Sequence, residues 1–187
     1  MKRKLLAIAL AVICLSSLAY GTLAYFTASD TAHNVITSGG VDIDLLEWAD
    51  EDKKTPFPEG GVSGVMPGVD VTKIVEVKNT GLGEAYIRVK VEKAITLAEG
   101  VEAEIDLGLL SIDFDKENWT EKDGYYYYNK PLAPGEVTEA LFAAVTFDPA
   151  MGNEYQNSTA TVNVTAQAVQ VANNGDSAVE ANGWPAE

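Results

Sequence analysis

Residues 85–92 read Ala-Tyr-Ile-Arg-Val-Lys-Val-Glu, and residues 160–168 read Ala-Thr-Val-Asn-Val-Thr-Ala-Gln-Ala. In both stretches an aliphatic residue occupies every second position. A period of two is that of a β-strand that has one face on a core and the other in water. These two segments therefore predict half-buried strands, and they decide the fold class.

Weaker alternation and turn residues extend this pattern along the chain. Further strands are expected at 41–46, 69–78, 125–128 and 137–147. Pairs of turn residues separate them, because Gly, Pro, Asn and Asp suit the backbone conformations of tight turns. These pairs and triplets are Pro67-Gly68, Asn79-Thr80-Gly81, Asp123-Gly124 and Pro134-Gly135.

The sequence also predicts the structure of three segments that connect the strands. The turn at 79–81 predicts a hairpin that joins 69–78 to 85–92. Residues 50–65 are acidic and then rich in Pro and Gly, which predicts a long loop. Residues 94–109 carry apolar side chains at a spacing of four, which predicts one helix.

Seven or more strands with at most one or two short helices predict a mainly β fold. The expected architecture is a jelly-roll-type antiparallel β-sandwich. We expect four parts: a signal peptide over 1–24, an N-terminal segment over 25–40, the sandwich domain over 41–172, and a polar tail over 173–187. The tail is expected to be loosely ordered.

The first 24 residues have the pattern of a secretory signal peptide. Three basic residues at 2–4 precede a nearly unbroken apolar run over 5–18. Small residues before the boundary predict cleavage between Ala24 and Tyr25, and an uncleaved anchor is the alternative. The apolar run is short for a stable membrane span. The mature chain is therefore expected to be secreted, to reach the extracellular matrix or cell surface, and to have no membrane contact after cleavage.

Charge and cysteine content exclude several classes of partner and site. The chain has 13 Lys and Arg against 28 Asp and Glu. Three of the basic residues lie in the predicted signal, so the mature chain carries a net charge near −18. Such a surface repels phosphate, so no nucleic acid partner is expected. The sole cysteine, Cys14, also lies in the signal, which leaves no disulfide or thiolate site in the mature chain.

Few residues could carry catalysis or bind a ligand. His33 is the one histidine, so a His-Glu-x-x-His zinc motif cannot form, and neither an enzymatic activity nor a cofactor is expected. Residues 113–117 resemble the start of a calcium loop. Asn118 and Gly124 stand where that loop needs Gly and Glu, which favours a solvated acidic turn and no metal site. The tyrosines at 125–128 could form a carbohydrate platform, although strand packing with alternate rings inward is favoured.

Several motifs occur in an order found in a known family. They are Gly21 to Phe26, Asn34-Val35-Ile36, Gly39 to Ile43, Met66-Pro67-Gly68, Val77 to Gly81, Trp119, Asp123 to Tyr128, Leu132 to Glu136 and Ala166 to Gln170. Through these motifs, the chain resembles over most of its length the TasA/camelysin-like secreted proteins of bacterial biofilm matrices.

The resemblance implies a jelly-roll fold, processing by a SipW-type signal peptidase at Ala24 or one residue later, and self-assembly into extracellular filaments. In such fibres the N-terminal segment of one subunit completes the sheet of the next. Phe26, Ala28, Val35 and Ile36 are the apolar residues available for this strand donation. An accessory matrix or anchoring protein is a further expected partner. Camelysin is described as a metalloprotease, but this sequence offers no zinc motif to carry that activity.

Three functions therefore remain open at the level of sequence. The favoured one is a structural fibre subunit that assembles by strand donation. The second is a monomeric surface module that holds polysaccharide or cations through the tyrosine run or the acidic face. The third, a secreted protease, rests on the resemblance alone.

Overall fold

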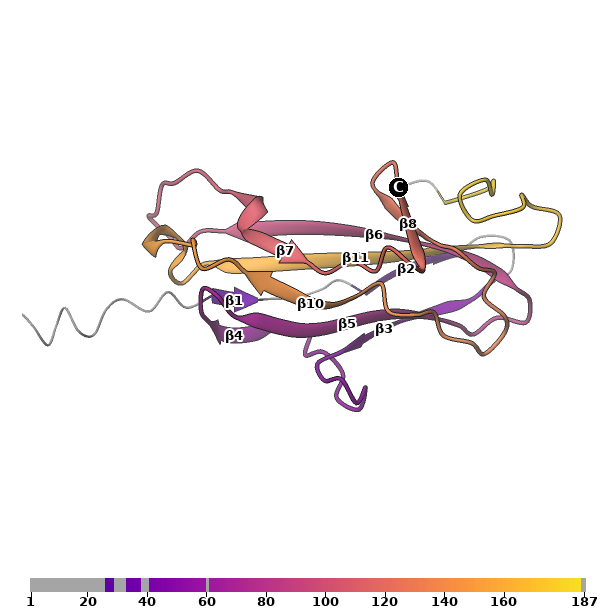
Figure 1. Ribbon diagram of the computed structural model, residues 1–187, viewed down its shortest axis with the longest axis horizontal. Coiled ribbons are helices and arrows are strands. Elements are labelled where there is room, and N and C mark those ends of the chain that lie inside the picture. Colours follow the sequence, from indigo (N-terminus) through magenta and orange to yellow (C-terminus); the bar gives the residue numbers. More distant parts are fainter. Residues whose placement is uncertain (1–25, 29–32, 38–40, 60, 186–187) are drawn as a thin grey trace, which may run out of the picture.

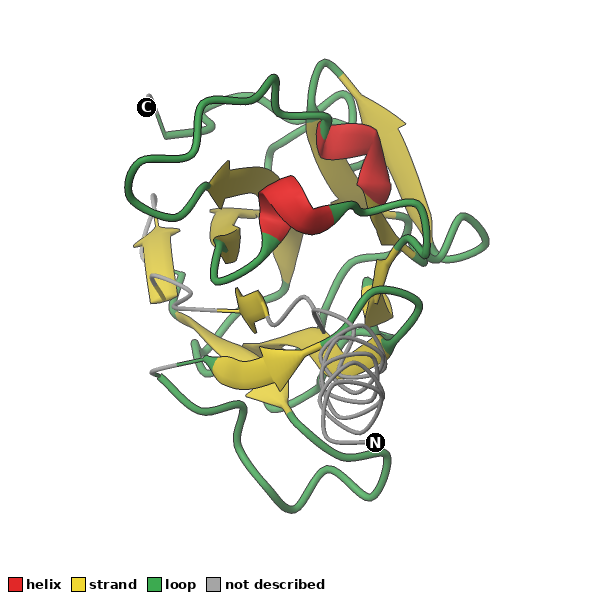
Figure 2. Ribbon diagram, turned by 90° about the vertical axis from the view of Figure 1, so that its left-hand side faces the viewer, coloured by secondary structure: helices red, strands yellow, loops and turns green. Residues whose placement is uncertain are grey.

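The computed structural model describes residues 26–28, 33–37, 41–59 and 61–185, with side chains from residue 41 onward. Two sheets pack face to face and form an elongated sandwich (Figures 1 and 2). In spatial order, the larger sheet contains β4 (Val62–Val65), β1 (Phe26–Ala28), β11 (Thr159–Gln170), β6 (Ala85–Thr96), β9 (Tyr125–Tyr128) and β8 (Trp119–Lys122), with β2 (His33–Thr37) also paired to β11. The smaller sheet contains β3 (Ile43–Trp48), β5 (Asp70–Asn79), β10 (Phe142–Phe147) and β7 (Leu110–Ile112).

The predicted mainly β sandwich with no more than two short helices is confirmed. In the described part of the chain, the only helices are the 3-10 turns η1 (Leu107–Leu109) and η2 (Asn153–Tyr155). The strand pairs are antiparallel except for two, since β1 and β2 each run parallel to β11. These two strands come from the predicted N-terminal segment, so the sandwich extends beyond the expected start at residue 41.

The two strands that decided the fold class lie together at the centre of the larger sheet. β6 and β11 pair antiparallel from Ala85↔Gln170 to Thr96↔Thr159. Their inner faces meet the smaller sheet in one apolar core, because every second residue of each strand points inward. Fully buried members of this core are Ile87, Val89 and Val164 from the larger sheet, and Val75, Val77, Phe142 and Phe147 from the smaller one.

The hairpin predicted between 69–78 and 85–92 is wrong. β5 lies in the smaller sheet between β3 and β10, whereas β6 lies in the larger sheet. The turn between them carries the chain from one sheet to the other. The Asn79 side chain holds this turn, since it donates to the carbonyls of Gly83 and Leu132 and accepts from the Gly81 N–H.

Two expectations for the connecting segments are also wrong. The helix expected at 94–109 does not form, because β6 continues to Thr96 on β11 and only three residues near the end of the segment form a 3-10 turn. The long loop expected at 50–65 contains β4, which pairs with β1. In contrast, Asp123 and Gly124 form the predicted turn between β8 and β9, with φ of 52° and 78°. Positive φ at both positions is typical of a type I′ hairpin.

The tail is packed against the sandwich, so the expectation of loose order is wrong over residues 173–185. Ala178 and Ala181 are buried in a second apolar cluster with Tyr127 and Val169 on the outer face of the larger sheet. The expected half-buried pattern is confirmed over the first half of β11 and is wrong beneath the tail, where residues on both faces of β6 and β11 are buried. The last strand of the sandwich ends at Gln170, and the described part of the tail adds no strand.

Candidate functional site: the N-terminal strands beside β11

β11 has two edges, and different parts of the chain cover them. β6 pairs with one edge along the whole strand. β1 pairs with the other edge at the start of β11, and β2 pairs with it further along (Figure 1). β1 and β2 thus lie beside the same edge of β11, and both run parallel to it.

The four residues predicted for strand donation all fall in β1 and β2. Ala28 is paired with Ala160 of β11 and with Val62 of β4, and Phe26 is paired with Val65 of β4. In β2, Val35 is paired with Ala166 and Ile36 with Gln167. These pairings occur within one chain, and they show which edge the segment can occupy.

The chemistry of this site is that of backbone hydrogen bonding. β2 is paired with five consecutive residues of β11, from Val164 to Ala168. Val164 and Ala166 are fully buried, so this part of the edge borders the core. An edge left bare here would lose its ladder hydrogen bonds, each worth about 0.5–1.5 kcal/mol net, and would expose apolar surface. β11 therefore requires a partner strand on this side.

Three further residues of the N-terminal region were singled out in the sequence, namely His33, Ala24 and Tyr25. His33 begins β2 and is paired with Val164, so it belongs to the strand ladder. The predicted signal peptide and the cleavage residues Ala24 and Tyr25 lie outside the described residues.

The tyrosine run is β9, and its alternate rings face opposite sides of the sheet. Tyr126 stacks on Phe114 with ring centroids 4.2 Å apart, and Tyr128 lies 5.1 Å from Trp119. Burial raises the pKa of both Tyr126 and Tyr128 to about 12, with smaller contributions from nearby carboxylates. The Tyr128 ring belongs to the interior, whereas the Tyr126 ring is half-buried.

The other two tyrosines do not form an open platform either. Tyr127 is 6% exposed beneath the tail. The Arg88 guanidinium carbon lies 3.9 Å from the Tyr125 ring centroid and 4.7 Å from that of Trp184. Arg88 also donates to Gln167 at 2.7 Å. This aromatic clamp was not predicted, and the only sequence signal for it is a tryptophan in an otherwise polar tail.

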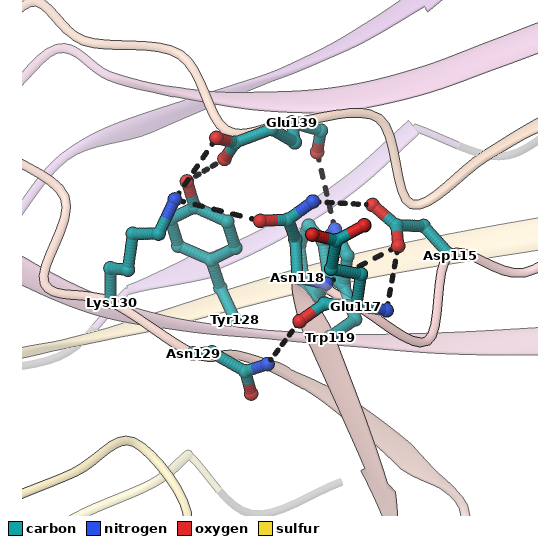
Figure 3. A network of polar contacts seen from close by, with 8 residues as sticks. All are labelled: Asp115, Glu117, Asn118, Trp119, Tyr128, Asn129, Lys130 and Glu139. Carbon is teal, nitrogen blue, oxygen red and sulfur yellow. Dashed lines mark hydrogen bonds and ion pairs between the residues drawn. The ribbon is translucent and has the colours of Figure 1, made fainter.

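The acidic segment 113–117 accepts hydrogen bonds from strand β10 and from its own turn. Asp113 accepts hydrogen bonds from the N–H groups of Ala143 and Ala144 at 3.0 and 2.7 Å. Asp115 accepts from the Asn118 side chain at 2.9 Å, and this bond is the main cause that lowers its pKa (Figure 3). Among the residues with described side chains, no group of three or more His, Cys, Asp or Glu residues could hold a metal ion.

One groove lies next to this segment, at the edge strand β8. It has a volume of about 310 Å³. Its lining residues are Asp115, Lys116, Trp119, Thr120, Glu121 and Tyr126. Aromatic, charged and hydroxyl groups therefore meet in one depression, which sequence periodicity alone could not have indicated.

The fold and this site define a β-sandwich protein whose N-terminal strands complete the larger sheet. No protein family model, curated protein or solved structure matches the chain. Over the described residues, no helix combines the length and apolar character needed to cross a membrane.

Proposed function

We propose that this protein is a secreted structural subunit of extracellular biofilm-matrix fibres. In this proposal the N-terminal segment of one copy adds to β11 of the next copy after a SipW-type signal peptidase has removed residues 1–24. The observation that carries the proposal is the pairing of β1 and β2 with an edge of β11 that borders the core. The protein acts through assembly, without a catalytic role, and an accessory matrix protein would anchor the fibre.

The physical basis is exchange of equivalent contacts between copies. The ladder that β2 makes with its own β11 can form equally well with β11 of a second copy, so the exchange costs no backbone hydrogen bonds. The donated strand and the accepting edge are different surfaces. Such contacts are heterologous and can continue from copy to copy.

The first prediction is that the processed chain, residues 25–187, forms thin filaments visible by electron microscopy. Deletion of residues 25–37 is expected to abolish them, because the chain then has no strand to donate to the free edge of β11. A synthetic peptide of residues 25–37, added in trans, is expected to restore the circular dichroism and the melting temperature of the deleted chain without restoring filaments. Filaments of equal abundance from the deleted chain would exclude strand donation.

A second candidate function uses the groove beside β8. Its aromatic and hydroxyl residues are of the kind that bind sugar rings, so a monomeric module that binds polysaccharide is the alternative. It predicts a monomer in solution and glycan binding that Lys116→Ala and Glu121→Ala weaken. Filaments together with no binding on a broad glycan array would reject it.

A further inference from the structure

The parallel register of β2 determines at which end of the sandwich the N-terminal segment joins the rest of the chain. β2 ends at Thr37, which is paired with Ala168. Ala168 in turn is paired with Ile87, close to the start of β6. We call this the Leu82 end, because the turn that precedes β6 contains Leu82. The opposite end contains the turn at Pro67-Gly68 and η1.

The chain that follows β2 stays at the Leu82 end. The carbonyl of Asp42 accepts hydrogen bonds from the N–H groups of Thr80 and Gly81, both at 3.0 Å. Ile43 is then paired with Asn79 at the start of β3. Between Thr37 and Asp42 the chain advances five residues, which span at most about 18 Å even when fully extended.

The turn itself presents an apolar side chain on a rigid support. Asn79 is 0% exposed and ties the turn together through its side-chain hydrogen bonds. A Cβ added at Gly81 would come within 2.9 Å of the Asp42 nitrogen, so the turn is closely packed on Asp42. Leu82, in contrast, is 98% exposed. This leucine buries almost nothing within its own chain, and the turn holds it in a defined position.

We propose that donor and acceptor copies meet at their Leu82 ends and that the two Leu82 turns form part of the contact. This inference rests on the proposed strand donation. When β1 and β2 of a donor lie on the β11 of an acceptor in the same register, the donor Thr37 is paired with Ala168 at the acceptor Leu82 end, and the donor Asp42 lies within about 18 Å of that Thr37. The donor Asp42 carbonyl is hydrogen-bonded to the donor's own Leu82 turn, so the Leu82 turns of donor and acceptor are brought together. A second copy of the chain therefore covers Leu82.

The polarity of the assembly follows from this geometry. Each copy gives its strand and receives one at the same end of the sandwich. Two copies that exchange strands with each other close into a dimer, whereas exchange with a third copy leaves an open row. In both products the opposite ends, with Gly68 and η1, point away from the contact.

Cysteine cross-linking tests this arrangement cleanly, because the processed chain contains no cysteine. Leu82→Cys in residues 25–187 is expected to give covalent dimers on mild oxidation of assembled material. The matched control is Leu107→Cys, which changes an exposed leucine at the opposite end and is expected to give none. Assemblies that cross-link through position 107 and not through position 82 would overturn the inference and leave the proposed function standing.

A charge substitution gives a second readout. Leu82→Asp is expected to raise the concentration needed for assembly roughly tenfold, with an unchanged melting temperature of the monomer. Leu107→Asp is expected to leave that concentration unchanged. Equal effects of the two variants would overturn the inference. Absence of assembly in the unsubstituted chain, by light scattering and electron microscopy, would overturn the proposed function and the inference with it.

Discussion

At the scale of single residues, Glu47 and Lys73 form an ion pair inside the sandwich. Their Oε1 and Nζ atoms lie 2.8 Å apart, and the side chains are 1% and 3% exposed. The Lys73 ammonium also lies 4.0 Å from the Phe57 ring centroid. Burial lowers the Lys73 pKa, and the Glu47 charge opposes that change. Each charge therefore depends on its partner.

Removal of one partner is expected to destabilise the protein strongly. Lys73→Met leaves the Glu47 carboxylate buried without its cation, and the expected loss in the free energy of unfolding is about 3–5 kcal/mol. The double variant Glu47→Leu/Lys73→Met is expected to recover most of that loss, because neither charge is then buried. Urea denaturation of both variants measures the difference. A double variant no more stable than Lys73→Met alone would contradict this expectation.

The contacts of Glu139 predict how the fold responds to acid. Glu139 accepts a hydrogen bond from the Tyr128 hydroxyl and pairs with Lys130 at 3.0 Å (Figure 3). The Tyr128 bond is the main cause that lowers the Glu139 pKa from its ordinary value of 4.5. A carboxyl group with a lowered pKa stabilises the fold above its unfolded pKa, and the stabilisation is lost as pH falls through the folded pKa.

The protein is therefore expected to lose stability as pH falls below about 4.5. Glu139→Gln is expected to be less stable than the parent at pH 7 and to lose less between pH 7 and pH 3, because it has no carboxyl group to protonate there. Denaturation at both pH values measures this. Glu59→Gln, a change at an exposed carboxyl outside this network, is the control. The same pH dependence for the parent and Glu139→Gln would contradict the assignment.

At the scale of elements, the tail acts as a cover over the outer face of the larger sheet. Trp184 lies on the Arg88 guanidinium and 5.8 Å from the Tyr127 ring centroid. Its indole N–H is buried and has no hydrogen-bond partner among the described residues. The contribution of this residue therefore comes from ring packing.

Loss of that ring is expected to loosen the tail. Trp184→Ala is expected to lower the free energy of unfolding by about 1–3 kcal/mol, since it removes apolar packing and a cation–π contact. Trp184→Phe keeps a ring and is expected to lose less than half as much. Thermal denaturation and limited proteolysis at the C-terminus compare the two. Early cleavage of both variants alike would show that the ring does not hold the tail.

Elements also differ in how far the sequence could predict them. The Asp123-Gly124 hairpin was predictable because both positive φ angles are set by the turn residues themselves. The turn at 79–81 has equally strong turn chemistry but joins two sheets. Turn residues show where the chain bends. They do not show which strand the next segment will pair with.

At the scale of the whole molecule, the register of β2 permits a direct test of strand exchange. Val35 and Ala166 are paired across the β2–β11 ladder. Adjacent strands bring such positions within reach of a disulfide, and the processed chain contains no competing thiol. Val35→Cys/Ala166→Cys therefore allows the segment to be fixed on its own β11.

The oxidised double variant, purified as a monomer, is expected to form no filaments, because its N-terminal segment cannot leave. Reduction is expected to restore assembly to the parent level. Each single cysteine variant is the control and is expected to assemble with or without a reductant. Electron microscopy and light scattering measure the outcome. Assembly of the oxidised double variant would exclude exchange of β2 between copies.

Local patterns in the chain were enough to predict the mainly β class, the strands around 85–92 and 160–168, and the small catalytic inventory. This was possible because side-chain periodicity and residue content are local properties of the chain. Three features required the folded structure: the sheets that β5 and β6 join, the cover that the tail forms over Arg88, and the position of Phe26, Ala28, Val35 and Ile36 in strands on or next to β11. Strands are joined by backbone N–H and C=O groups that nearly every residue carries, so the choice of partner depends on how the whole chain packs.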